Sequence, residues 1–221
     1  MNKRLLGLFF LALLPTLVQF IAKMFESYSI GLILRIISHI VIPVFAVAYL
    51  TNISLKKSFF IPLRLKSKKS IFYYSFIFSI GAIFIITLAY FLLGQFVDFS
   101  NIEEQLRAYN ITKLTYPLIA LAIILINPFL EEYFWRGFVF RVFDKYSKGY
   151  WTGILFALHH VVIVTGWFNW WQFLLVTLFL SIIGILFNYI YKKTDSIYAT
   201  WIIHTVADII IVFIGYFVVF N

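Results

Sequence analysis

The sequence contains no cysteine and few charged residues. The missing cysteine excludes disulfide bonds, thiolate metal ligands and cysteine nucleophiles. Charged residues make up 12% of the 221 positions, about half the usual share in globular proteins. Hydrophobic residues make up 63%, and the mean hydropathy is +0.97. These values exclude a soluble globular domain and indicate an all-α, polytopic membrane protein.

The sequence also shows no strand-like alternation, low-complexity tract or internal repeat. Because no inverted repeat is visible, the usual sign of a secondary transporter is missing. Apolar runs predict a membrane helical bundle of about seven transmembrane helices, at residues 5–22, 30–54, 70–94, 114–140, 151–166, 170–191 and 196–220. We expect a single membrane domain, with motif-free helices in residues 1–113 and the functional core in residues 114–221.

Acidic residues are scarce: nine face 18 basic residues, for a net charge of +9. The basic residues lie in short loops between apolar runs, which indicates contact with anionic lipid headgroups and excludes nucleic acid as a partner. The loop from Lys56 to Lys69 is basic and contains no acid. The positive-inside rule therefore predicts that this loop and the amino terminus are cytoplasmic and that Asn221 is outside. The composition indicates a bacterial cell membrane.

Three charged residues interrupt the apolar run at 114–140, namely Glu131, Glu132 and Arg136. A charge inside a membrane helix costs on the order of 3 kcal/mol on insertion scales, so such residues indicate function. Glu132 and Arg136 are four residues apart, in the favourable order for a helical ion pair. Glu131 points about 100° away from Glu132 and is expected to face another helix.

Two further polar motifs occur in later runs, Phe156…His160 and His204…Asp208. With the predicted topology, Glu131, His160 and His204 all lie roughly 12–15 Å from the cytoplasmic boundary, at ~1.5 Å per residue. Asp208 lies one turn deeper. The shared depth predicts one polar site inside the membrane, nearer the cytoplasmic face.

The order of these motifs, E-E-x-x-x-R, F-x-x-x-H and H-x-x-x-N/D on successive membrane helices, resembles the CPBP family. This family includes type II CAAX prenyl proteases and bacteriocin-processing and abortive-infection proteins. The resemblance covers about residues 114–212. It implies an intramembrane endopeptidase that hydrolyses a membrane-associated peptide or protein, of the CAAX type or of the bacteriocin or leader-peptide type. One departure is Asp208, where prenyl-processing members usually carry Asn, and it weakens the case for a prenylated substrate.

The expected catalytic residues are Glu131, His160, His204 and Asp208. Glu131 is the expected general base that activates water, while the histidines position the water or stabilise the oxyanion. Asp208 either joins this chemistry or holds His204.

Glu132, Arg136 and Phe156 are expected to support the site. Glu131, His160 and His204 also form an adequate zinc ligand set with an open position for water. The same side chains could act without a metal, and the sequence leaves both versions open.

The sequence also leaves a non-catalytic alternative open. The same pocket could bind a peptide or toxin without turnover, as a bacteriocin self-immunity or abortive-infection protein does. A proton-coupled carrier is a third class. For the enzyme, we expect the substrate to enter from the cytoplasmic leaflet.

The remaining polar residues of the apolar runs are expected to have no part in the chemistry. We expect His159 and His39 to be helix-packing residues, and the sequence leaves open that His159 shares the role of His160. Arg35 and Lys23 are expected to extend toward the headgroups.

Overall fold

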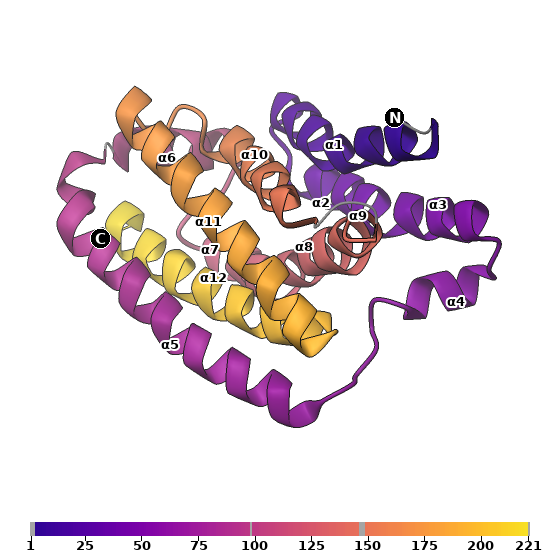
Figure 1. The fold of residues 1–221 in the computed structure, drawn as a ribbon. Coiled ribbons are helices and arrows are strands. Elements are labelled where there is room, and N and C mark those ends of the chain that lie inside the picture. Colours follow the sequence, from indigo (N-terminus) through magenta and orange to yellow (C-terminus); the bar gives the residue numbers. More distant parts are fainter. Residues whose placement is uncertain (1–2, 98, 146–148, 221) are drawn as a thin grey trace.

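The computed structural model describes residues 3–97, 99–145 and 149–220. These residues form helices and connecting turns, with no strand among them, which confirms the all-α fold class (Figure 1). Met1 and Asn221, whose sides of the membrane the sequence predicts, lie outside the described residues.

Within the described residues, five helical stretches are long and apolar enough to cross a membrane: Tyr28–Leu50, Lys68–Phe96, Tyr116–Phe143, Trp170–Thr194 and Ile197–Phe220. Two further apolar helices, Phe9–Met24 and Gly149–Val164, are shorter. The chain is therefore an integral membrane protein built as a helical bundle. The count of seven transmembrane helices stays a prediction, because two of the expected spans fall below this length.

The helices follow the predicted apolar runs closely. In order they are α1 (Lys3–Met24), α2 (Tyr28–Ile36), the π-helical turn η1 (Ile37–Val41), α3 (Ile42–Thr51), α4 (Leu55–Phe60), α5 (Lys68–Leu93), the 3-10 turn η2 (Gly94–Phe96), α6 (Phe99–Ala108), α7 (Tyr116–Leu125), α8 (Asn127–Phe134), the π-helical segment η3 (Trp135–Phe140), α9 (Arg141–Phe143), the 3-10 turn η4 (Gly149–Trp151), α10 (Thr152–Val164), α11 (Trp170–Thr194) and α12 (Ile197–Phe220).

Polar contacts at one end of the bundle join the loops that connect its helices. Lys66, in the basic loop before α5, forms an ion pair with Asp195 in the turn between α11 and α12. Lys192, at the end of α11, contacts the Asp144 carboxylate at 3.1 Å, just after α9. The basic loop and the α11–α12 turn therefore lie at the same end of the molecule.

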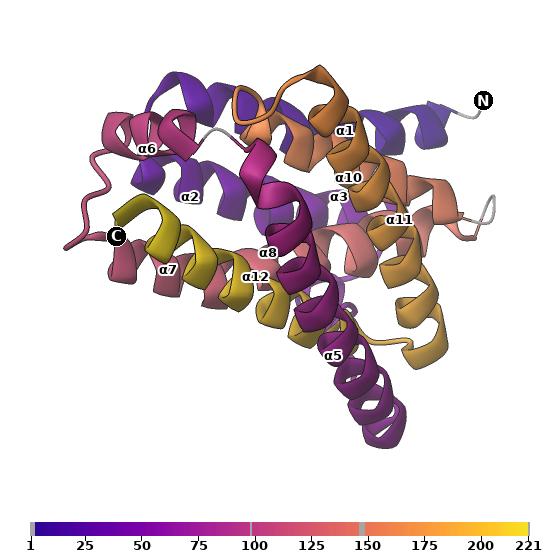
Figure 2. The same cartoon turned by 90° about the vertical axis from the view of Figure 1, so that its left-hand side faces the viewer.

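The opposite end is joined in the same way. The Tyr116 hydroxyl, at the start of α7, donates a hydrogen bond to the Val212 carbonyl of α12 at 2.8 Å. Lys23, at the end of α1, donates to the Thr165 carbonyl after α10 at 2.8 Å. Figure 1 shows α6 and the carboxyl end of α12 at this end, away from α4, and Figure 2 shows them on the same side of the molecule.

The outer surface of the bundle is apolar. Large side chains such as Phe72, Phe91, Leu118 and Phe213 are exposed. A soluble monomer rarely exposes apolar patches of this kind, whereas the lipid-facing surface of a membrane bundle does so by necessity.

The segment that carries the first motif is the most buried part of the chain. Every residue from Leu130 to Phe140, which includes the end of α8 and all of η3, is buried. α10 is held close to α11 by two glycines: a Cβ added at Gly153 would lie 2.6 Å from the Gly184 carbonyl carbon. These contacts fix the backbones that present the polar side chains of the three motifs.

Candidate active site

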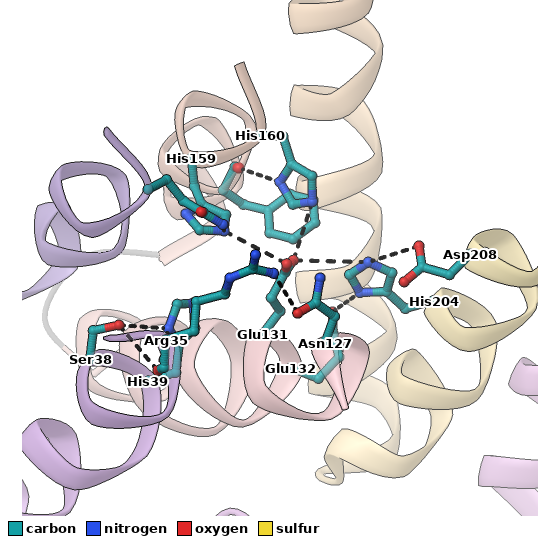
Figure 3. A network of polar contacts seen from close by, with 12 residues as sticks. Arg35, Ser38, His39, Asn127, Glu131, Glu132, His159, His160, His204 and Asp208 are labelled. Atoms are coloured by element: carbon teal, nitrogen blue, oxygen red, sulfur yellow. Dashed lines mark hydrogen bonds and ion pairs between the residues drawn. The ribbon is translucent and has the colours of Figure 1, made fainter. Parts of the chain in front are cut away.

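Glu131 lies at the centre of a polar cluster formed by side chains from three helices (Figure 3). Its Oε2 atom is 3.2 Å from His160 Nε2 on α10 and 3.9 Å from His204 Nε2 on α12. Its Oε1 atom is 3.7 Å from His159 Nε2, also on α10. The structure therefore brings together the three polar motifs that the sequence placed at one depth.

The His160 ring is oriented by its own helix. Its Nδ1 atom is 2.9 Å from the Phe156 carbonyl oxygen, and a carbonyl only accepts, so Nδ1 carries the hydrogen. The Phe156 ring also packs against the His160 ring, with 4.3 Å between centroids. Nε2 of His160 is consequently the nitrogen presented to Glu131.

The predicted ion pair between Glu132 and Arg136 is confirmed. Arg136 Nη1 donates to Glu132 Oε1 at 3.0 Å, and both side chains are completely buried. Arg136 Nη2 donates to the Gly184 carbonyl of α11 at 3.2 Å, and its guanidinium lies over the Phe156 ring. His204 Nδ1 also lies 3.0 Å from Glu132 Oε1, which orients its Nε2 toward Glu131. Glu132 and Arg136 together therefore link α8 and η3 to α11 and α12.

Asp208 lies at the more exposed edge of the cluster. Its Oδ1 atom is 3.8 Å from His204 Nε2, one turn away on the same helix. The side chain of Asp208 is 16% exposed and that of His160 is 19%, against 4% for Glu131. The cluster thus has a closed end at Glu131 and an accessible edge at His160 and Asp208.

His159 was expected mainly to be a helix-packing residue, and the structure instead favours the alternative that it shares the role of His160. It is completely buried, with Nε2 facing Glu131 and lying 3.5 Å from the Gln19 side chain of α1. His159 and His160 are adjacent on α10, so their side chains differ by about 100° in direction. Both can nevertheless reach the Glu131 carboxylate, because it lies between these two directions. A second histidine inside an apolar run was the available signal for this role.

One further correction concerns Arg35 on α2, whereas His39 in η1 is a packing residue as expected. Arg35 does not extend toward the headgroups: its Nη1 donates to Asn127 Oδ1 at 2.6 Å, inside the bundle. His39 is completely buried, its Nδ1 lies 3.0 Å from the Arg35 carbonyl, and its ring centroid is 5.5 Å from that of His159. His39 lies in the π-helical turn η1, which changes the direction of the following side chains and is not evident in the sequence.

The cluster contains one group of residues suited to a metal ion. Ligand atoms of Glu131, His159 and His160 lie within 4.8 Å of one another. Two imidazole nitrogens and a carboxylate oxygen are common zinc ligands, so the donor set fits this metal. The group differs from the predicted one because His159 takes the place of His204, whose Nδ1 contacts Glu132.

A separate pocket of about 200 Å³ lies between α3, α4 and η3. Its lining includes Val44, Pro62, Gly137 and Arg141 and is largely apolar. None of the clustered histidines or carboxylates lines it, so this pocket is not part of the polar cluster.

Residues 113–210 match the family described as Type II CAAX prenyl endopeptidase Rce1-like. Neither a curated protein nor a solved structure matches the chain. The matched segment contains all three motifs, whereas Gln19, Arg35 and His39 lie outside it. The family's description supports a membrane peptidase with a peptide or protein substrate. The match over residues 113–210 therefore supports the resemblance to the CPBP intramembrane proteases that the three motifs indicated.

Proposed function

We propose that the chain is an intramembrane endopeptidase that hydrolyses a peptide bond with water activated at Glu131. One observation carries this proposal: a buried carboxylate faces three imidazoles from two other helices, at 3.2–3.9 Å. A carboxylate and imidazoles at such distances provide both a base for water and donors for a developing oxyanion.

In this mechanism Glu131 removes a proton from a water molecule while the water oxygen attacks the carbonyl carbon of the scissile bond. The negative charge that develops on the carbonyl oxygen is stabilised by the protonated ring of His160 or His204. Their Nδ1 hydrogens are already donated to the Phe156 carbonyl and to Glu132, so only the protonated ring has an Nε2–H to offer. Glu131 then returns the proton to the leaving nitrogen as the C–N bond breaks. The net reaction consumes one water molecule and gives a carboxyl and an amine product.

The surrounding residues hold this arrangement in place. Glu132 orients His204 through its hydrogen bond, and Arg136 compensates the charge of Glu132. Asp208 contacts the His204 nitrogen that faces the cluster, and we assign it the role of holding that ring.

A zinc ion fits the same cluster, where Glu131, His159 and His160 would hold it. When bound, zinc supplies Lewis-acid polarisation and lowers the pKa of water. Glu131 would then be a ligand rather than the general base.

Metal content of the purified protein separates the two versions. If zinc is held here, the wild type should contain it and lose activity with a chelator, and His159→Ala should contain much less. An active wild-type protein without metal and insensitive to chelator would assign the chemistry to Glu131 alone.

We further propose that the substrate is a membrane-associated peptide or protein that enters from the cytoplasmic leaflet. The matched family supports a CAAX-type substrate, whereas Asp208 favours a bacteriocin or leader peptide. Cleavage of both substrate classes in liposomes, by the wild type and by Asp208→Asn, distinguishes them. Asp208→Asn should improve cleavage of the prenylated peptide if residue 208 sets this preference.

The Glu131→Gln variant tests the proposed function. It keeps the size of the side chain but removes the base, and loss of general-base catalysis costs about 10²–10⁴-fold in rate. Glu104→Gln, at an exposed position of α6, is the matched control and should retain wild-type activity. If Glu131→Gln folds normally and keeps the activity or the cellular function of the chain, a peptide-binding role is the better account.

A further inference from the structure

The pocket of about 200 Å³ between α3, α4 and η3 lies behind the segment that carries the proposed catalytic carboxylate. Tyr133, Gly137 and Arg141 line it, and their four-residue spacing places them on one face of the continuous α8–η3–α9 stretch. Tyr133 follows Glu131 by two residues, so its side chain points about 200° away, to the other side of the helix. The pocket is therefore separate from the polar cluster but shares a helix with it.

The walls of this pocket are largely apolar and meet closely on one side. Pro43 and Val44 of α3 and Phe138 of η3 are buried lining residues. The chain after α4 packs directly against η3, because a Cβ added at Gly137 would clash with Pro62. Sites for drug-sized ligands have volumes of ~300–1,000 Å³. A cavity of about 200 Å³ suits a slimmer apolar group, such as part of one hydrocarbon chain.

Two cations line the same pocket, Arg141 and Lys145. Arg141 is half-buried, donates to the Ile61 carbonyl at 3.2 Å and interacts with Tyr191. Lys145 is exposed, so the pocket reaches the surface of the bundle at this residue. Within the ranges that the structure describes, no carboxylate lies within 4.0 Å of either cation. The apolar pocket therefore has a positively charged opening.

The acid next to these cations in the sequence does not neutralise them. The Asp144 carboxylate contacts Lys192 Nζ at 3.1 Å. This contact is at the end of the bundle that carries the basic loop, which the sequence predicts to face the cytoplasm. The cytoplasmic leaflet is the one that carries negative surface charge from anionic lipids. The charge of the opening thus complements the headgroups expected beside it.

We propose that this pocket is a binding site for an anionic phospholipid of the surrounding membrane. Part of one acyl chain occupies the apolar pocket, and Arg141 and Lys145 hold the phosphate group. A guanidinium donates charge-assisted hydrogen bonds to phosphate oxygens, and an ammonium binds them as a point charge. The bound chain packs against the back of the helix that carries Glu131 and stabilises the folded bundle, as any ligand of the folded state does. Lipid binding here does not depend on the proposed function.

The competing account is a general attraction of anionic lipid to the basic end of the bundle. Each Lys or Arg near a negatively charged membrane surface then contributes roughly five-fold to the affinity, wherever it lies at that end. A pocket instead makes the lysine that lines it matter more than an equally exposed lysine outside it. Lys145 and Lys57 form this comparison, because both are exposed and only Lys145 lines the pocket.

The experiment titrates the full chain in detergent with phosphatidylglycerol or phosphatidylcholine of identical acyl chains and counts bound lipids by native mass spectrometry. The wild type should bind one phosphatidylglycerol about 10- to 100-fold more tightly than phosphatidylcholine, as expected for hydrogen bonds to a charged group. Lys145→Gln should lower the affinity for phosphatidylglycerol by about 10-fold and leave that for phosphatidylcholine nearly unchanged. Lys57→Gln, the matched control, should have little effect on either lipid.

A second pair of variants tests the acyl chain. Ile53, between α3 and α4, is a half-buried lining residue, and Ile53→Trp should fill the pocket and weaken the binding of both lipids. Leu55→Trp, at an exposed position outside the lining, should not. Glycerol phosphate has the headgroup chemistry without the chains and should not displace the bound phosphatidylglycerol. Displacement by glycerol phosphate would show a phosphate site without a chain and overturn the lipid assignment.

Phosphatidylglycerol with a photoreactive group on its acyl chain gives a readout that needs no variant. Its cross-links should concentrate in residues 43–62 and 133–145. Cross-links spread evenly over the apolar surface would overturn the proposal. So would equal affinity of the wild type for the two lipids, or equal losses in Lys145→Gln and Lys57→Gln. Each of these results leaves the proposed peptidase chemistry untouched.

Discussion

Glu132 accepts hydrogen bonds from two buried side chains of different helices, Arg136 and His204. Both members of the Glu132–Arg136 pair are completely buried, so neither charge can be solvated by water if the other is removed. Removing one partner of such a pair leaves an uncompensated buried charge. Glu132 is therefore expected to matter first for stability and only then for the orientation of His204.

The variant Glu132→Gln tests this role. We expect it to destabilise the folded protein by on the order of 3–5 kcal/mol, because the Arg136 guanidinium loses its counter-charge. The measurement is the midpoint of thermal unfolding in detergent, compared with the wild type.

The chain provides a matched control for that variant. Glu103 and Arg107 on α6 form a pair of the same i,i+4 spacing, with one contact of 2.6 Å, but both side chains are solvent-exposed. Solvent screening limits the contribution of such exposed pairs to stability to about 0–1 kcal/mol. Glu103→Gln should therefore change the midpoint of thermal unfolding little. Equal shifts in the two variants would contradict the structural role assigned to Glu132.

At the level of single residues, the sequence predicted part of the cluster. The i,i+4 spacing of Glu132 and Arg136 was sufficient to predict their ion pair, because helical geometry alone brings two such side chains together. The roles of His159 and Arg35 were misjudged because their neighbours come from other helices. The direction of His39 also depends on the π-helical turn η1, and no pattern in the sequence marks that turn.

At the level of elements, the contact between α10 and α11 positions the two histidines of α10. A Cβ at Gly153 would meet the backbone of Gly184 at 2.6 Å, and a Cβ at Gly184 would meet the Gly153 carbonyl oxygen at 2.5 Å. Backbone atoms cannot move aside as a flexible side chain can. Any larger residue at Gly153 must therefore push α10 away from α11, and His159 and His160 with it.

We expect Gly153→Ala to lower both the unfolding midpoint and the cleavage rate, with a destabilisation of about 1–3 kcal/mol from overpacking. Gly81→Ala, on α5, is the matched control because a Cβ there would meet nothing within 4 Å. Alanine is the better helix former by about 1 kcal/mol, so this variant should be neutral or slightly more stable. Gly153→Ala with unchanged stability and activity would show that the helices do not need this close approach.

The positions of the helices were largely predictable, because long apolar runs specify membrane helices with little help from tertiary contacts. The run at 114–140 was expected as one membrane helix, and the structure has one helical stretch there, Tyr116–Phe143, whose consecutive parts are α7, α8, η3 and α9. Pro128 lies in the first turn of α8, where it has no hydrogen bond to lose and marks the start of a new helix. The partial exposure of Asp208 and His160 depends on how the helices pack around the cluster, so the spacing of residues in the sequence did not predict it.

At the level of the whole molecule, the two ends of the bundle carry different charges. The basic loop with Lys56, Lys57 and Lys66 lies at the end that carries the α11–α12 turn. The opposite end carries α6, with Glu103 and Glu104. The positive-inside rule predicts that the basic end faces the cytoplasm.

The absence of cysteine makes this topology directly measurable. A cysteine introduced in Lys57→Cys should react with a membrane-impermeant maleimide only after the membrane is opened, whereas Glu104→Cys should react in intact right-side-out vesicles. Both positions are exposed, so accessibility of the side chain does not limit either reaction. The reverse pattern would invert the topology, and reaction of both from one side would contradict the arrangement of the helices across the membrane.

The central claim is that side chains from separate helices act as one hydrolytic unit around Glu131, and a double-variant cycle tests it most directly. The measurement is kcat/KM for cleavage of a lipidated peptide in liposomes by the wild type, Glu131→Gln, His160→Ala and the double variant. Residues that act as a unit are strongly non-additive, so the double variant should lose no more activity than the more damaged single variant. Losses that multiply in the double variant would show that Glu131 and His160 act independently, and would contradict a shared site.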